Sequence, residues 1–237
     1  MPLFDGLDTD DQPPEKRSRV TLLKPEQLLQ AYAIGVFPMA ESRNDPRMFF
    51  VDPDKRGIIS LDRIHISRSL RKAMRRSAFD VRCNTAFEVV LDSCAEVTED
   101  RPDTWINPQI RQLYLELAAQ GRCHSVEVWS GDALVGGLYG VALGGAFFGE
   151  SMFSRVTNAS KIAMVHLVAR LRAGGFSLLD CQFITDHLRQ FGAEEISRAA
   201  YHALLEDALR RPATFYSLPD EGGALVSSLL QSSSQTS

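Results

Sequence analysis

The chain has 237 residues, enough to form one sizeable domain or one domain with a small annex. Its hydrophobic content of 44% and charged content of 24% are ordinary for a globular protein. The net charge of −4 argues against RNA binding over the whole surface, so any RNA contact must come from a local basic patch.

The cysteines, histidines and chain ends bear on cofactors and location. The four cysteines show no short paired spacing and the five histidines no metal-binding spacing, so we expect neither a metal site nor a disulfide framework. Residues 1–20 are polar, unlike a secretory signal, and no run of 18 apolar residues could span a membrane. We expect a cytoplasmic protein, with residues 1–20 and the Ser/Gln-rich tail, residues 218–237, disordered.

Turn and capping residues divide the chain into elements. A first helix begins near Pro25 and ends at Gly35, and an unusually long loop then continues to Gly57. The later expected elements are a basic helix over 67–76, a strand over 79–82, a helix capped by Asn84 and ending near Val97, a helix from Asn107 to Gly121, strands over 124–129, 133–143 and 145–153, a helix over 159–173, a strand over 177–182, a short helix ending at Gly192, and a helix from Ser197 to about Leu209.

This order of elements predicts the fold class. Helices, an antiparallel run of strands and then helix–strand–helix indicate an α+β or α/β body with a mixed central sheet over residues 63–217. Residues 21–62 would form a small N-terminal domain beside it. A cleft between the two parts would be a natural ligand site.

Glu150 lies inside the apolar segment Phe147–Ser154. A carboxylate there needs a partner or a cationic ligand to offset its desolvation. One interpretation, favoured by the general frequency of structural ion pairs, is that Glu150 pairs with an arginine or a backbone amide. The other is a pocket with aromatic walls and one acidic recognition point.

Asp180 and Gln182 end a strand that reads as buried. Ligands tend to bind beyond the carboxyl ends of strands in open sheets, and residues two apart share one face of a strand. The two side chains could therefore orient and polarise an amine nucleophile. Alternatively, Asp180 merely begins a loop and Gln182 caps a neighbouring element, and the spacing alone does not decide.

The basic helix carries Arg68, Lys72 and Arg75 on one face, at i, i+4 and i+7. Such a stripe suits contacts to phosphates, although a charge run is more often a solvated surface. The near absence of acidic residues there, in an acidic protein, favours the phosphate interpretation. Trp105, just before a helix, is either a core residue or the wall of a side-chain pocket.

Several segments, spread in order over about residues 21–200, form a specific combination. They are residues 31–32, 35–39, 65–70, 104–106, 124–129, 134–140, 148–154, 158–161 and 180–182, which read AY, GVFPM, HISRSL, TWI, HSVEVW, LVGGLYG, FGESMFS, NASK and DCQ. Together they closely resemble the leucyl/phenylalanyl-tRNA–protein transferase family.

The resemblance implies an acetyltransferase-like (GNAT-type) C-terminal domain with a small N-terminal domain. It implies transfer of Leu or Phe, less well Met, from tRNA to proteins that begin with Arg or Lys, which marks them for degradation. No metal or organic cofactor would be needed, and we expect a monomer without membrane contact.

The resemblance also implies roles for individual residues. Asp180 and Gln182 would activate the attacking amine, and Arg68, Lys72 and Arg75 would contact the acceptor stem. The aminoacyl-adenosine site would be formed by Glu150, Trp105, Phe147, Met152, Ser154, Phe50 and Tyr32. The chain departs from the family at Phe49–Phe50, where relatives have one or two tryptophans; a phenyl ring can stack but cannot donate an indole N–H bond.

Two other functions fit the sequence less well. An acetyl-CoA-dependent N-acetyltransferase would need a Gly-rich pyrophosphate loop, and the junction at residues 155–161 lacks that pattern. A non-catalytic RNA-binding module would have no use for the Asp180 and Gln182 pair.

Overall fold

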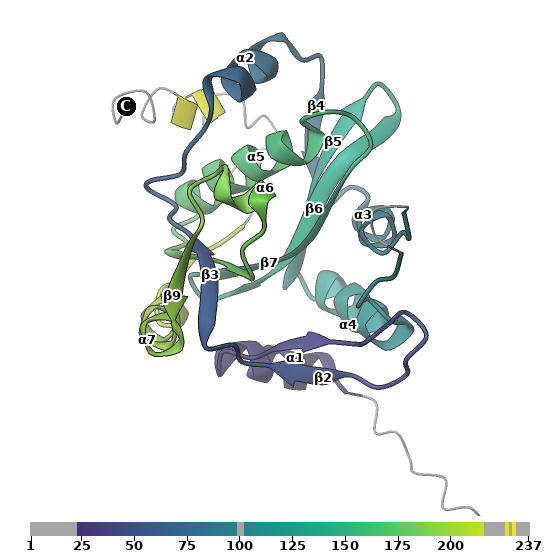
Figure 1. The fold of residues 1–237 in the computed structure, drawn as a ribbon, viewed down its shortest axis with the longest axis vertical. Helices are drawn as coiled ribbons and strands as arrows, with labels where there is room; N and C mark the ends of the chain where they lie inside the picture. Colours follow the sequence, from purple (N-terminus) through teal and green to yellow (C-terminus); the bar gives the residue numbers. More distant parts are fainter. Residues whose placement is uncertain (1–22, 99–101, 216–225, 228, 231–237) are drawn as a thin grey trace, which may run out of the picture.

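A computed structural model describes residues 23–98, 102–215, 226–227 and 229–230. A seven-stranded mixed sheet, in the order β4-β5-β6-β7-β8-β3-β9, forms the centre of the protein, and β1 and β2 form a separate pair (Figure 1). This confirms the expected α+β class with a mixed sheet. The strands are β1 (Phe37–Met39), β2 (Phe49–Val51), β3 (Lys55–Ile59), β4 (Asp80–Cys83), β5 (Cys123–Ser130), β6 (Ala133–Leu143), β7 (Ala146–Ser154), β8 (Leu178–Gln182) and β9 (Glu194–Ser197). The helices are α1 (Pro25–Ala33), α2 (Arg68–Arg76), α3 (Phe87–Cys94), α4 (Pro108–Ala119), α5 (Ala159–Ala173), α6 (Asp186–Arg189) and α7 (Arg198–Leu209).

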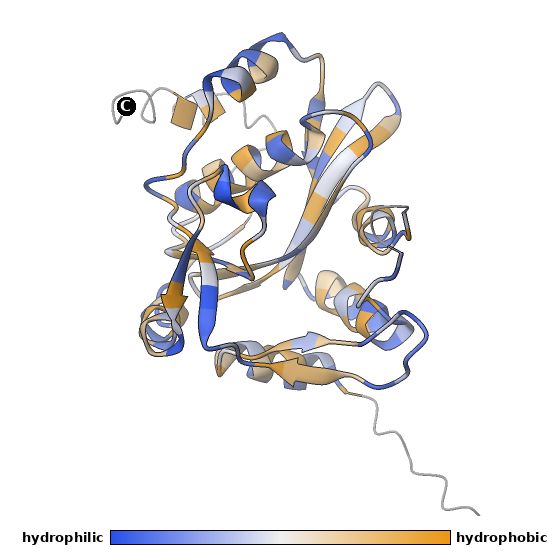
Figure 2. Cartoon of the chain, in the orientation of Figure 1, coloured by the Kyte–Doolittle hydropathy of each residue, from blue (hydrophilic) through white to orange (hydrophobic). Residues whose placement is uncertain are grey.

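Helices cover both faces of the central strands. The long helix α5 packs on β5, β6 and β7 from one face, and α3 and α4 pack from the other (Figure 1). The strands β5 and β6 are accordingly coloured mainly orange and white in Figure 2. Close packing of α5 requires Gly136, because a Cβ atom there would lie 2.5 Å from the Cβ of Ala159. None of the described helices is both long and apolar enough to cross a bilayer.

The segment expected to be a long loop contains strands instead. Phe37–Met39 pairs antiparallel with Phe49–Val51, and β3 lies between β8 and β9 in the large sheet. The loop prediction was wrong, and for β3 the reason is that the strands that hold it lie more than a hundred residues later, so no local pattern marks it. Residues 55–59, expected in the N-terminal part, are thus strand residues of the central sheet.

The start of α3 depends on a distant carboxylate rather than on a local cap. Asn84 was expected to cap this helix, but it has a φ of 60° and accepts a bond from the Ser125 amide instead. Glu127, which is fully buried on β5, accepts the backbone N–H groups of Thr85 and Ala86 at 2.9 and 2.8 Å. The cap expectation was wrong because the acceptor comes from a neighbouring strand, where a helix N-terminus can equally be satisfied.

The end of the chain differs from the expected disordered tail. Residues 226, 227, 229 and 230 are helical, and Val226, Leu229 and Leu230 are buried in the same core as α5. The expectation failed there because the many serines conceal an apolar i, i+3, i+4 pattern. The expected disordered N-terminus, residues 1–20, and the rest of the tail lie outside the described residues.

Candidate active site

The parallel strands β7 and β8 separate and leave a cavity between them. Their pairing covers only three residue pairs and ends at Phe148 and Asp180. Beyond that point the two strands line a cavity of about 480 Å³, within the range of small-ligand sites. Most of its walls are apolar or aromatic, and they include Phe37, Met39, Trp105, Leu138, Met152, Met164, Leu167, Leu179 and Phe183, with Glu150 and Gln182 among the few polar side chains.

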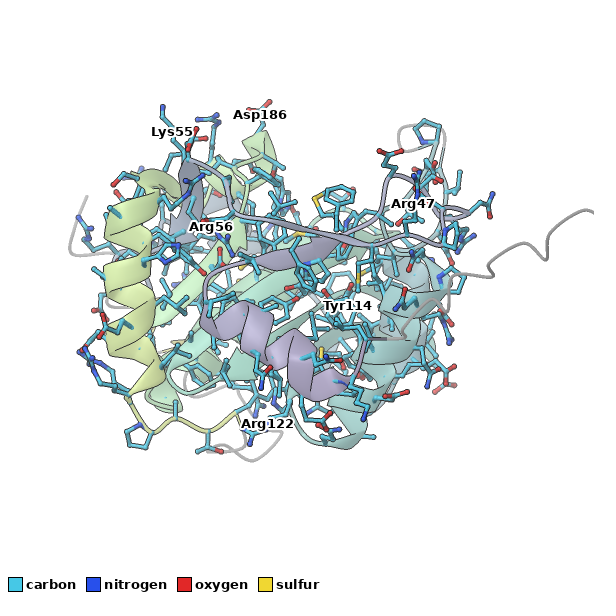
Figure 3. All side chains as sticks on the ribbon, turned by 90° about the horizontal axis from the view of Figure 1, so that it is seen from below. Arg47, Lys55, Arg56, Tyr114, Arg122 and Asp186 are labelled. Carbon is cyan, nitrogen blue, oxygen red and sulfur yellow. The ribbon has the colours of Figure 1, made fainter. Side chains whose placement is uncertain are left out.

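Glu150 forms a closed ring of contacts with two tyrosines. Tyr32 of α1 donates to Glu150 Oε1 at 2.8 Å, and Tyr114 of α4 donates to Oε2 at 2.7 Å. The two phenol oxygens are themselves 2.8 Å apart. Figure 3 shows Tyr114 in the interior of the protein, near α1.

The ring determines the protonation of Glu150. Each of its three oxygen–oxygen contacts needs one proton, because two oxygens with facing lone pairs repel each other at this distance. Burial raises the pKa of both tyrosines, so they supply two protons. A proton on Glu150 satisfies the third contact: one tyrosine then donates to the carboxyl group, while the other donates to its neighbouring tyrosine and accepts from Glu150. Burial also raises the pKa of Glu150 to about 7, despite the opposing hydrogen bonds from Tyr114 and Tyr32.

Asp180 does not line the cavity, although it lies directly behind it. It is fully buried, and each of its oxygens accepts two bonds. Oδ1 accepts from Arg56 Nε at 2.9 Å and from the Gln182 amide at 2.8 Å. Oδ2 accepts from Arg56 Nη2 at 2.6 Å and from the Tyr201 hydroxyl at 2.9 Å. With its lone pairs occupied, Asp180 is placed to fix Gln182 rather than to take a proton from a ligand.

Gln182 brings a polar side chain to the cavity at the end of β8. Its Nε2 lies 3.5 Å from Glu150 Oε1. Its backbone has a φ of 55°, a left-handed conformation that is costly for a residue other than glycine and clusters at functional sites. The bond from its N–H to Asp180 stabilises this conformation. Within the described residues, no group of three or more His, Cys, Asp or Glu side chains is placed to hold a metal ion.

Arg56 connects the N-terminal part of the chain to β8. Its guanidinium pairs with Asp180, donates to the Gly35 carbonyl at 2.8 Å, and lies over the rings of Phe37 and Tyr201. Burial would lower the pKa of Arg56, but the bonds and charge of Asp180 outweigh it and raise the pKa. Figure 3 shows Arg56 inside the protein and the preceding Lys55 at its edge.

The sequence of the chain matches a known family over most of its length. The profile described as "Leucyl/phenylalanyl-tRNA protein transferase" matches residues 58–206, and that of the family's N-terminal domain matches residues 22–54. A leucyl/phenylalanyl-tRNA–protein transferase from Paramagnetospirillum magneticum is 62% identical, over 81% of this chain and 92% of that protein. One of the same name from Maricaulis maris is 57% identical, over 88% of this chain and 97% of that protein.

The chain belongs to the leucyl/phenylalanyl-tRNA–protein transferase family. It is therefore an enzyme of the aminoacyltransferase class. The match to this family's N-terminal domain ends at residue 54, directly before β3, and the main match begins at residue 58, within β3.

In this transferase, some of the residues expected to form the aminoacyl-adenosine site line the cavity and others do not. Trp105, Met152 and Ser154 line the cavity with Glu150 and Gln182. Three expected residues do not line the cavity: Tyr32 lies buried behind Glu150, Phe50 is exposed on β2, and Phe147 is buried, with its ring stacked on Phe215. Alternation along β7 explains Phe147, since its side chain packs into the core beneath α5.

The sequence analysis of this transferase did not identify Arg56 and Tyr114. They donate hydrogen bonds to the two acidic residues of the site, Asp180 and Glu150. Glu150 and Asp180 each signalled that a partner was needed, but nothing in the chain marks Arg56 or Tyr114 among the many arginines and five tyrosines. Partners so distant in sequence are determined by topology.

The basic helix α2 is an exposed element at one end of this transferase (Figure 1). Ser67 caps it by accepting the Leu70 amide, and Leu70 is its buried residue. The remaining face carries a shallow hollow lined by basic side chains, which are those of Arg68, Arg71, Lys72, Arg75 and Arg76. The structure therefore gathers the expected stripe of Arg68, Lys72 and Arg75 on one surface.

Proposed function

We propose that this protein transfers Leu or Phe, and less readily Met, from the 3′ end of aminoacyl-tRNA to proteins that begin with Arg or Lys. The observation that carries the proposal is an apolar cavity, at the separation of β7 and β8, with Glu150 and Gln182 at its polar end. The names of the relatives support the leucyl and phenylalanyl donors. In this proposal the enzyme acts as a cytoplasmic monomer without a cofactor, and its products are marked for degradation.

The separation of two parallel strands also supports an acetyltransferase-like (GNAT-type) architecture, in which the main body comprises about residues 63–217 together with β3. The preceding segment would act as the small N-terminal domain that closes one side of the cavity. Phe37 and Met39, both in the cavity lining, are its contribution to the site.

The cavity walls fit the donor side chain. Met152, Met164 and Trp105 present flexible and aromatic surfaces that can enclose Leu or Phe. Ser154, at the same wall, is placed to contact the polar part of the aminoacyl ester. The exposed ring of Phe50, on the β1–β2 pair, offers a face on which the terminal adenine can stack.

The reaction is aminolysis of an ester. The acceptor nitrogen attacks the carbonyl carbon, the bond to the ribose oxygen breaks, and the proton lost by nitrogen balances the charge on the departing oxygen. Because the ester is already activated, the protein has mainly to position the two reactants. We assign the orientation of the amine to the Gln182 side chain, with Asp180 as a positioning residue and Glu150 as a neighbouring polar group.

The test is transfer of radiolabelled Leu from charged tRNA to a peptide with an N-terminal Arg. We expect transfer by the wild type, and a decrease of about 100-fold or more in the Gln182→Ala variant, typical of losing a group that orients a proton transfer. Gln190→Ala, at an exposed glutamine that contacts Lys161, is the matched control and should keep full activity.

A different result would refute each part of the proposed function. No transfer by the wild type with properly charged tRNA would refute the proposed function. Equal rates for Gln182→Ala and wild type would refute the role of Gln182. Consumption of acetyl-CoA in the absence of tRNA would favour an N-acetyltransferase instead.

For tRNA itself, we propose contacts between the acceptor-stem phosphates and Arg68, Lys72 and Arg75. Their support is the exposed basic hollow on α2. Such contacts are additive and depend on salt, in contrast to the buried groups of the cavity.

A further inference from the structure

We propose that the C-terminal segment, defined as residues 226, 227, 229 and 230, fixes the position of α2 and thereby sets the affinity for tRNA. In this arrangement Arg71 is a positioning residue rather than a phosphate ligand. The inference rests on the proposed binding of tRNA by α2.

The helix α2 has little attachment of its own. It has nine residues, and Leu70 is its buried side chain, while Met74 packs partly against the core. A helix of this length is marginal in water and depends on packing for its stability and its position. Contacts from outside α2 must therefore decide where its cations lie.

Arg71 also lines the basic hollow, but its guanidinium bonds to backbone carbonyls of the protein body. Its Nε donates to the Ile66 carbonyl at 2.9 Å, and its Nη1 donates to the Leu230 carbonyl at 3.3 Å. Arg71 is half-buried, whereas Arg68, Lys72 and Arg75 are exposed. The same guanidinium thus joins the chain that enters α2 to the C-terminal segment.

The C-terminal segment is anchored from its other side by apolar packing. Val226, Leu229 and Leu230 are 7%, 3% and 7% exposed, and they belong to the core cluster that includes Leu70. Figure 1 shows the segment, in yellow, beside α2. Burial of three such apolar side chains is enough to order a short segment.

The C-terminal segment lies apart from the transfer site. The family match ends at residue 206, twenty residues before Val226. None of the four residues of the segment lines the cavity, so a change there leaves the walls of the transfer site in place. Its removal should act on α2 and leave the chemistry of bound substrate unchanged.

The experiment compares the wild type with a variant that ends at residue 225. One substrate is leucyl-tRNA and the other is 3′-leucyl-adenosine, which has no acceptor stem. If α2 holds its binding position about a tenth of the time without the segment, the Kd for tRNA should rise about tenfold. Transfer from leucyl-adenosine should stay within about twofold of wild type, since this substrate contacts the cavity alone.

A second variant, Arg71→Gln, keeps the apolar segment and tests the role of the arginine. We expect weaker tRNA binding with an unchanged slope of log Kd against log salt, because no phosphate contact is lost. Loss of a true phosphate ligand would lower the slope by about 0.7–0.9, as expected for Arg75→Ala. A lowered slope for Arg71→Gln would overturn the positioning role.

The remaining outcomes separate the two proposals. Equal tRNA affinity in the shortened variant and the wild type would overturn the inference. Equal losses with both substrates would also overturn it, since the segment would then merely stabilise the whole fold. Failure of the wild type to transfer Leu from tRNA would refute the proposed function itself.

Discussion

The cavity and the basic helix α2 handle charge in opposite ways. Beside the cavity, Arg56 and Asp180 are 1% and 0% exposed, and every bond of the carboxylate has a defined partner. On α2, the cations of the stripe, Arg68, Lys72 and Arg75, are exposed and lie together without acidic neighbours in the helix. Individual hydrogen bonds therefore determine the properties of the buried site, whereas the number and position of the charges determine those of α2.

The largest effect should come from separating the buried pair. Arg56→Met leaves Asp180 charged and uncompensated in the interior, which costs about 3–5 kcal/mol. The free energy of unfolding in urea measures this loss. Arg198→Met is the matched control, because Arg198 pairs with Asp52 and Asp54 at the surface and should cost less than about 1 kcal/mol. Equal losses for the two variants would show that burial of the pair is not what matters.

A smaller, pH-dependent effect should come from Glu150. Its pKa of about 7 in the folded protein lies above the ordinary value of 4.5, so the folded state binds the extra proton between these values. Stability from this group is therefore present at low pH and is lost as the pH rises from about 4.5 to 7. We expect the wild type to lose on the order of 2 kcal/mol relative to Glu150→Gln over this range.

Unfolding free energies of both proteins at several pH values provide the measurement. Other titrating groups cancel in the difference between the two variants. A constant difference from pH 4.5 to 8 would contradict the shifted Glu150 and the three-proton ring with Tyr32 and Tyr114.

The smallest effect should come from a single cation of α2. Arg75→Ala should weaken the binding of leucyl- and phenylalanyl-tRNA equally, by a few-fold, and lower the salt slope by less than 1. Arg210→Ala, directly after α7, removes an exposed charge that pairs with Glu206 and should change neither quantity. A change in the Leu to Phe preference in Arg75→Ala would instead connect α2 with the cavity.

The elements that the sequence predicted well are those with local signals. The helix over 159–173 and the strand over 133–143 have the expected bounds, because apolar runs end there at turn residues. The strands β3 and β9 were missed, since their pairing is with each other and with β8 across more than a hundred residues.

The candidate site divides in the same way. Glu150 and Gln182 were found as polar residues in apolar segments, and both reach the cavity. Asp180 was also predicted as a site residue. Its four hydrogen bonds could not be predicted, because three of them come from Arg56 and Tyr201 on other elements. Phe147 was assigned to the pocket although strand alternation turns it into the core.

The carboxylate of Glu127 affects the order in which parts of the chain can fold during synthesis. Thr85 and Ala86, directly before α3, donate their N–H groups to a strand residue about forty positions later. A ribosome that has synthesised residues 84–96 has therefore not yet supplied the group that satisfies the start of this helix. The bonds that fix the N-terminal cap of α3 can therefore form only after β5 has emerged, so the entry into this helix is fixed late in synthesis.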